Sequence, residues 1–200
     1  ENCAVTGVIG AIYPKPNIYR GPTPWYDSYN IYGVNEPAVS EIQKYAKETG
    51  MTFYDIRAQH GLLRDIMMRN SNTGEFMVLI QFHYDVEGDE ERAKALLEYV
   101  ADKFPEITSL IYVDNQKGND TFGDLELTTF KGTDFIYETM EDLKFKVGPK
   151  SFYQTNTDQA YHLYSIAREF ANLSGNELVY DLYTGTGTIA NFVAHKAKKV

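Results

Sequence analysis

The residues best suited to chemistry lie near the C-terminus, in a glycine-containing segment between a predicted strand and a predicted helix. This segment covers residues 181–190 and reads Asp-Leu-Tyr-Thr-Gly-Thr-Gly-Thr-Ile-Ala. Glycines at such a turn let the backbone approach a ligand closely, and the first turn of the following helix presents unpaired amide donors. The pattern therefore predicts a small-molecule site, with the carboxylate of Asp181 at the end of the strand.

Three interpretations of this segment compete. The first is a tight turn that binds no ligand. The second is a dinucleotide site, since Gly185, Gly187 and Ala190 satisfy the loose Gly-x-Gly-x-x-Ala fingerprint. The third is a loop for S-adenosylmethionine, whose cationic amino-acid end a carboxylate attracts, whereas that carboxylate would repel a pyrophosphate. The segment has no Walker lysine, which disfavours a P-loop. Asp181, four residues before Gly185, favours the S-adenosylmethionine interpretation.

A second element precedes this loop by one predicted helix. Residues 145–156 read Phe-Lys-Val-Gly-Pro-Lys-Ser-Phe-Tyr-Gln-Thr-Asn. The two elements, their order and their separation resemble the RNA uracil-C5 (5-methyluridine) methyltransferase family, which depends on S-adenosylmethionine. Members place Ser-Phe-Phe-Gln-x-Asn, then a helix, then Asp-Leu-Tyr/Phe-Cys-Gly-x-Gly-Asn/Thr. This chain departs from that pattern at Tyr153, at Thr184 in place of cysteine, and at Thr188, where many members have asparagine.

The resemblance implies roles for particular residues. Phe152 and Gln154 would line the pocket for a flipped uracil. Lys150 is a candidate for contact with a phosphate because of its position beside this element, rather than from the resemblance. Arg64 and Arg69 are further candidates for RNA contact, because arginine suits phosphate; pairing with neighbouring carboxylates is the alternative. No metal site is expected. The positions that would contact or shape the cofactor site are Gln154, Asp181, Tyr183, Gly185, Gly187 and Thr188.

The chemistry implied by the resemblance needs a residue that this sequence does not supply. A cysteine thiolate would add to carbon 6 of uracil, and carbon 5 would then take the methyl group before a base removes its proton. Cys3, the single cysteine, lies far from the family's nucleophile position. We therefore expect the catalytic cysteine and base beyond Val200, and a fragment that is inactive alone. The parent enzyme would methylate a uridine of ribosomal or transfer RNA.

Two alternatives from other functional classes remain open at this point. One is a non-catalytic RNA-binding or assembly module built on a decayed methyltransferase, which would bind cofactor without turnover. The other is an NAD-dependent oxidoreductase using the glycine turn. Comparing the binding of the two cofactors separates them.

Composition limits the remaining possibilities. The formal net charge of −9 argues against a protein that holds nucleic acid by bulk electrostatics, so RNA contacts must come from local patches. One cysteine allows neither an internal disulfide nor a cysteine-held cluster. No apolar run is long enough to span a bilayer, so we expect a soluble, cytoplasmic protein without a membrane partner.

Periodicity predicts three parts. Residues 1–35 form a proline- and tyrosine-rich leader, in which prolines exclude a regular helix or central strand. Residues 36–145 form an α+β central domain with a mostly antiparallel sheet, and residues 146–200 begin a Rossmann-like α/β methyltransferase domain. Helices are expected over 37–50, 89–104 and 155–173 and from Thr188, and strands over 51–57, 62–69, 75–84, 108–113, 125–130, 135–140, 143–147 and 177–182.

Overall fold

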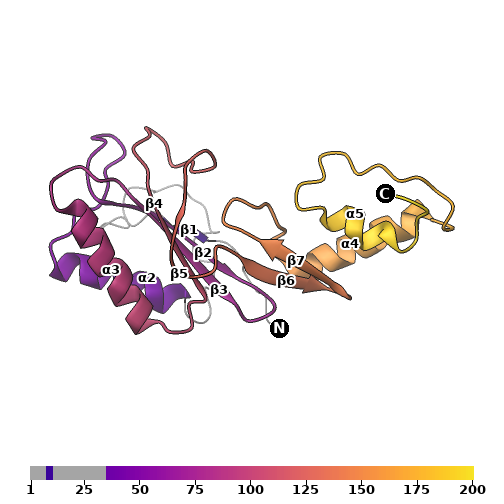
Figure 1. Ribbon diagram of the computed structural model, residues 1–200, viewed down its shortest axis with the longest axis horizontal. Helices are drawn as coiled ribbons and strands as arrows, with labels where there is room; N and C mark the ends of the chain where they lie inside the picture. The colour runs from indigo at the N-terminus through magenta and orange to yellow at the C-terminus, as the bar shows by residue number, and fades with distance from the viewer. Residues whose placement is uncertain (1–7, 11–34) are drawn as a thin grey trace, which may run out of the picture.

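The larger part of the molecule is a five-stranded sheet (Figure 1). The computed structural model describes residues 8–10 and 35–200. The strands follow the order β1-β2-β3-β4-β5, and every neighbouring pair is antiparallel except β3 and β4. This confirms the predicted α+β fold with a mostly antiparallel sheet. The strands are β1 Val8–Gly10, β2 Leu63–Asn70, β3 Phe76–Phe82, β4 Ser109–Asp114 and β5 Thr128–Gly132.

Two helices, α2 (Asn35–Glu48) and α3 (Asp89–Lys103), lie together against the sheet (Figure 1). Helix α3 connects the parallel strands β3 and β4, as such a crossover must. Every residue of β3 is buried, because one set of alternating side chains meets the helices and the other set faces away from them. The first core unites Ile42 of α2, Leu96 of α3 and Val78 of β3.

The rest of the described chain packs on the opposite set of sheet side chains. The hairpin of β6 (Ile136–Met140) and β7 (Leu143–Val147) is followed by α4 (Thr157–Ala171) and α5 (Thr188–Ala194). In Figure 1 the hairpin lies between the sheet and these two helices. A second core joins Leu79 of β3 to Phe145 of β7 and Phe192 of α5. The hairpin therefore shares one core with both neighbours, and the predicted division near residue 146 stays a prediction.

Side chains of the turn between β2 and β3 connect the sheet to the outer side of β6. Asn72 Nδ2 donates to the carbonyl of Thr139 at 2.7 Å, and its Oδ1 accepts from the amide of Thr139 at 2.9 Å. Thr73 Oγ1 donates to the carbonyl of Tyr137 at 2.7 Å, and Glu75 Oε2 accepts from the amide of Tyr137 at 2.6 Å. Together these bonds satisfy the backbone of β6 on the side that faces away from β7.

Two predicted strands are wrong. Residues 51–57 contain only isolated bridges, because the Asp55 carboxylate accepts from the amides of Arg57 and Ala58 and so closes a turn. Residues 177–182 form a single parallel bridge, between Leu178 and Lys199, and Tyr180 is 82% exposed. A parallel strand is buried only when it has neighbours, and this segment has one bridging residue among those described.

Asn156 caps α4, with its side chain accepting from the amide of Gln159 at 3.0 Å, so the helix begins two residues later than the predicted start at residue 155. Strand β1 lies in the predicted leader, and the prolines there fall outside the described residues, as does Cys3. Within residues 8–10 and 35–200, no helix is both long enough and apolar enough to cross a membrane.

Candidate functional site

The carboxylate of Asp181 organises the glycine loop. Its Oδ2 accepts from Thr184 Oγ1 at 2.8 Å and from the backbone amide of Ala190 at 3.1 Å. Ala190 lies in the first turn of α5, whose N-cap residue, Gly187, has no side chain to satisfy those amides. Asp181 therefore acts as the missing cap and fixes the loop against the helix.

The tip of this loop is open and bears an exposed aromatic ring. Gly185 has φ +55°, and a β-carbon added there would meet nothing within 4 Å. Tyr183 also has positive φ, +62°, and its side chain is fully exposed. A tyrosine in this backbone region is uncommon, and such strain concentrates at ligand sites. The loop therefore offers free backbone and a ring to a ligand.

The glycine loop is joined to the element around residues 152–154, and the sequence analysis assigned both to one site. Thr186 Oγ1 donates to the carbonyl of Phe152 at 3.2 Å and shares a hydrogen bond with Thr188 Oγ1 at 2.8 Å. Tyr164 of α4 lies close to both parts, because its hydroxyl interacts with Gln154 of the first and with Asp181 of the second. The pKa of this hydroxyl is raised, chiefly by burial and further by the charge of Asp181, while the hydrogen bond with Gln154 opposes the increase. The two motifs, 27 or more residues apart, thus form one surface.

The two aromatic residues of the 152–154 element have different surroundings. Phe152 is 72% exposed, although such a residue in isolation would be taken for a core aromatic. Tyr153 does belong to the second core: its ring lies 5.9 Å from that of Phe145, and burial raises the pKa of its hydroxyl. Phe152 is therefore available to a ligand, while the neighbouring Tyr153 anchors this segment in the second core.

Arg69 connects the sheet to this element. Its Nη1 donates to the carbonyl of Gly148 at 3.0 Å and to that of Ser151 at 2.8 Å. Burial lowers the pKa of its guanidinium. Arg69 thus holds the turn that carries Phe152, and its hydrogen bonds leave it poorly placed for a phosphate. Lys150, on the same turn, is exposed, and its Nζ donates to the carbonyl of Leu125 at 2.5 Å, which leaves its other two donor hydrogens for a ligand.

Arg64 does not fit the predicted contact with RNA. It is 2% exposed, and its guanidinium lies 4.3 Å from the ring centroid of Tyr54. Its Nε donates to Asp120 at 3.0 Å, while Nη1 donates to the carbonyls of Asn115 and Lys117, each at 2.7 Å. A guanidinium enclosed in this way cannot meet a phosphate on the surface. We therefore correct its role to holding the loop after β4.

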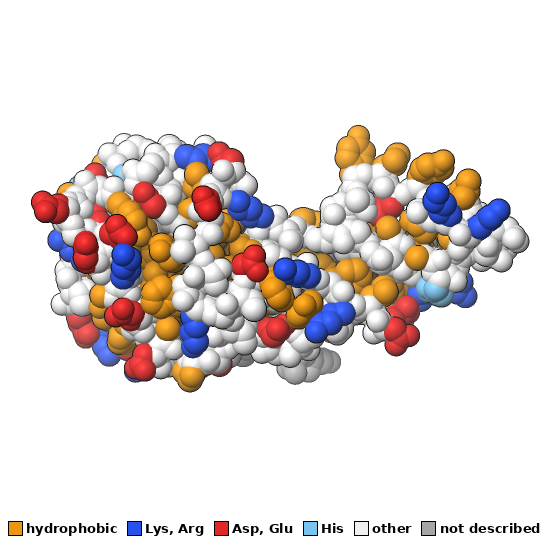
Figure 2. All heavy atoms as spheres, viewed as in Figure 1, with side chains coloured by type: hydrophobic (Ala, Val, Ile, Leu, Met, Phe, Trp, Pro, Cys, Tyr) orange, Lys and Arg blue, Asp and Glu red, His pale blue; other side chains and the backbone are white. Residues whose placement is uncertain are grey.

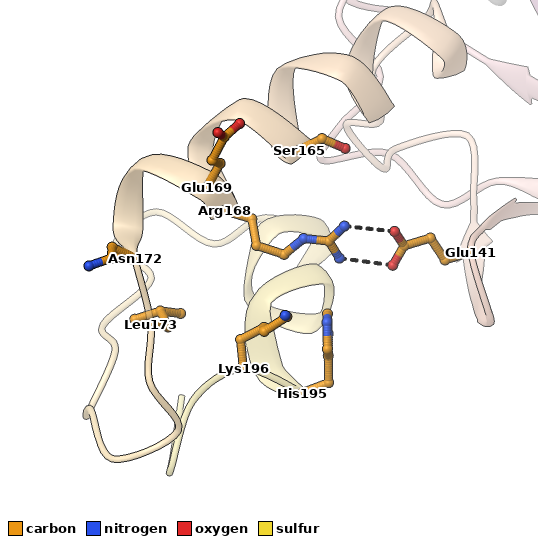
Figure 3. A pocket seen from close by; sticks show the side chains of 8 residues that line it. All are labelled: Glu141, Ser165, Arg168, Glu169, Asn172, Leu173, His195 and Lys196. Carbon is orange, nitrogen blue, oxygen red and sulfur yellow. Dashed lines mark hydrogen bonds and ion pairs between the residues drawn. The ribbon is translucent and has the colours of Figure 1, made fainter.

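A cavity of about 600 Å³ lies between α4, α5 and the turn after β6 (Figure 3). Arg168 crosses it and binds Glu141 through two hydrogen bonds, of 2.9 and 2.8 Å. Its guanidinium also lies 4.0 Å from the ring centroid of Phe192. His195 and Lys196 line the same cavity. Because Glu141 neutralises Arg168, this pair fastens α4 to the hairpin rather than forming a free anion site.

Comparisons with known proteins relate this geometry to a family, although no family model matches the chain. A protein of Bacteroides thetaiotaomicron named an uncharacterized RNA methyltransferase is 56% identical over 159 residues, covering 80% of this chain and 35% of that protein. One from Porphyromonas gingivalis with the same name is 60% identical over 148 residues, covering 74% and 31%. One from Bacillus cereus is 37% identical over 168 residues, covering 83% and 36%. This chain is a relative of RNA methyltransferases.

A solved structure agrees with this relationship at the level of the fold. The tRNA (uracil-54, C5)-methyltransferase of Pyrococcus abyssi, solved with S-adenosyl-L-homocysteine, matches 82% of this chain with a TM-score of 0.63 and 22% identity. The match covers 38% of that structure. The predicted relationship to RNA methyltransferases and the predicted fold class are confirmed. The chain spans about a third of the length of the RNA methyltransferases that it matches.

Two residues of the site escaped sequence analysis. Thr186 stands between the two glycines, where the pattern treats any residue as equivalent, yet its hydroxyl joins the loop to Phe152. Tyr164 has the spacing of an ordinary core residue of α4, and nothing in the sequence indicates that it lies between Gln154 and Asp181. Both act through tertiary contacts, which a linear motif does not record.

Proposed function

We propose that this chain forms the cofactor-binding loop and an RNA-facing region of an S-adenosylmethionine-dependent RNA methyltransferase that acts on carbon 5 of a uridine. The target RNA would be ribosomal or transfer RNA. The observation that carries this proposal is the hydrogen bond from Thr186 to Phe152, which joins the glycine loop to the 152–154 element. The names of the relatives and the solved enzyme from Pyrococcus abyssi support the same function.

The residues around the glycine loop fit the proposed cofactor. Free space at Gly185 admits a ligand against the backbone, and the exposed ring of Tyr183 can pack on an adenosine. Asp181 gives one oxygen to the loop and keeps negative charge beside it, which favours the cationic end of S-adenosylmethionine over a pyrophosphate. Gln154 and Thr188 complete the proposed set. When bound, the cofactor supplies an electrophilic methyl group.

The exposed ring of Phe152 gives the proposed substrate a place beside that cofactor. A base that reacts at carbon 5 must leave its stack, and an exposed aromatic ring next to the loop can receive it. Arg69 and Tyr153 hold the turn that carries Phe152, so buried contacts fix the backbone from which the ring projects. Lys150 lies two residues away and can approach a flanking phosphate.

Cofactor choice is tested by titrating the chain with S-adenosyl-L-homocysteine and with NAD in a calorimeter. We expect S-adenosyl-L-homocysteine to bind and NAD not to bind. Thr186→Val keeps the size of the side chain but removes the hydrogen bond to Phe152, and should weaken binding about fivefold. Thr128→Val, at an exposed position of β5, is the matched control. Binding of NAD, or equal effects of the two variants, would overturn the proposed cofactor site.

The atom that receives the methyl group is tested in a chimera of this chain with the remaining two thirds of the Bacteroides thetaiotaomicron relative. RNA labelled with tritium at carbon 5 of uridine releases the label when that carbon is methylated. We expect release that depends on S-adenosylmethionine. Methylated RNA without release would assign another atom. Cofactor binding without any methylation, while the intact relative is active, would favour a non-catalytic RNA-binding module.

A further inference from the structure

The outer face of the β6–β7 hairpin carries aromatic rings and lysines side by side. The inner face of the hairpin, which includes Phe145, is buried in the second core. On the outer face, Lys144 Nζ lies 3.7 Å from the ring centroid of Tyr137, and Lys146 Nζ lies 3.9 Å from that of Phe135. Both lysines are exposed, and both rings are partly exposed. Figure 2 shows blue side chains over the narrow region between the two larger parts of the molecule.

This face continues into a cavity of about 460 Å³ between the hairpin and the sheet. Phe135 and Lys146 line it from the hairpin, and Lys150 lines it from the turn that leads to Phe152. Ile111 and Leu127 give it apolar walls, and carboxylates also border it. The cavity thus reaches Ser151, the residue that precedes Phe152 of the proposed uracil site.

Strand β7 and the turn after it are basic, whereas Glu141 and Asp142 lie at the tip of the hairpin and Glu126 and Asp134 border the cavity. Residues 143–150 contain three lysines, Lys144, Lys146 and Lys150, and no Asp or Glu, in a chain with a net charge of −9. Cations that follow a strand attract a polyanion, and aromatic rings between them provide faces on which bases stack irrespective of sequence. This combination is typical of surfaces that bind single-stranded nucleic acid.

We propose that the outer face of the β6–β7 hairpin and the adjoining cavity bind the single-stranded RNA that flanks the target nucleotide. Lys144, Lys146 and Lys150 contact phosphates, while Tyr137 and Phe135 stack on bases. This inference rests on the proposed function, because it names the RNA surface that leads to the proposed site. It replaces Arg64, which is enclosed, with residues that RNA can reach.

Fluorescence anisotropy of a labelled, uridine-rich 15-nucleotide RNA tests this surface in the full chain. Lys144→Gln with Lys146→Gln should lower the slope of log Kd against log salt by about 1.4, so binding at 0.1 M salt weakens about 25-fold. Tyr137→Leu should weaken binding about fivefold and leave the slope unchanged, because it removes stacking but no charge. Lys47→Gln with Lys94→Gln, on α2 and α3, removes equal charge elsewhere and should have less than a twofold effect.

Each outcome decides the inference. Equal loss in the hairpin and control double variants would show bulk charge attraction, and no binding by the unchanged chain would remove the RNA surface altogether. Competition by duplex RNA as strong as by single strands would refute stacking on the hairpin. Circular dichroism checks that each variant is folded. Because S-adenosyl-L-homocysteine binding by the unchanged chain is measured separately, failure here leaves the proposed cofactor site standing.

Discussion

Replacing Arg64 by methionine provides a direct test of its structural role. The side chain is fully enclosed, stacks on Tyr54 and bonds three groups of the loop after β4. Methionine fills most of the same volume but offers no donor. The substitution therefore removes the hydrogen bonds and leaves the packing against Tyr54 largely intact.

The expected cost follows from the groups left behind. The Asp120 side chain is 48% exposed, so water can replace the guanidinium and the loss of this ion pair costs little stability. The carbonyls of Asn115 and Lys117 lose a charged donor, and each buried acceptor left unpaired costs about 1–3 kcal/mol. Asn115 keeps a second contact, since His83 Nδ1 lies 3.2 Å from its carbonyl oxygen. We therefore expect the free energy of unfolding to fall by about 3 kcal/mol.

Urea denaturation followed by far-ultraviolet circular dichroism measures this change. Arg57→Met is the control, because Arg57 is an exposed arginine seven residues away and should change stability by less than about 0.5 kcal/mol. A loss of under about 1 kcal/mol for Arg64→Met would refute the reasoning. It would mean that water or neighbouring groups satisfy the loop without the guanidinium.

Three further predictions concern charged groups. Burial raises the pKa of Asp65 from 3.8 to about 6. Between these values the folded protein keeps a proton on Asp65 that the unfolded chain has lost, so the free energy of unfolding falls by up to about 3 kcal/mol as the pH rises from 4 to 6. Asp65→Asn should lack this component, and parallel pH profiles of urea midpoints for the two proteins would contradict it. Asp181→Ala removes the cap of α5, so hydrogen exchange of the Ala190 amide should accelerate about fivefold, and an unchanged rate would exclude the capping role. Arg168→Met should lower the stability measured in thermal melts by about 1 kcal/mol, and by less in 1 M NaCl, because salt screens the ion pair with Glu141. A loss of stability that does not depend on salt would mean that Arg168 acts by packing rather than through Glu141.

The sequence was informative where local chemistry decides structure. Strand-forming residues over 62–69 and 75–84 predicted two strands that the structure contains as β2 and β3, and the glycine segment predicted the turn before α5. The same reasoning failed at residues 177–182, because apolar residues there indicate a buried strand only if neighbouring strands are present. Tyr180 shows this limit: its β-propensity is high, yet it is 82% exposed.

The roles of individual arginines could not be predicted, because they depend on which loops fold over them. Arg64 and Arg69 lie on one strand and look alike in sequence. The first is enclosed by the loop after β4, and the second by the turn at residues 148–151. A residue type indicates which chemistry is available, whereas tertiary contacts determine whether a ligand or the protein itself uses it.

The side-chain bonds from Asn72, Thr73 and Glu75 to β6 also bear on how this protein avoids aggregation. Strand β6 is the outer strand of a two-stranded sheet, and an exposed strand of this kind recruits strands from other molecules. Here the backbone groups of Tyr137 and Thr139 are already occupied by those three side chains. The hairpin can therefore present its outer face to a ligand while the edge formed by β6 is closed to pairing with another strand.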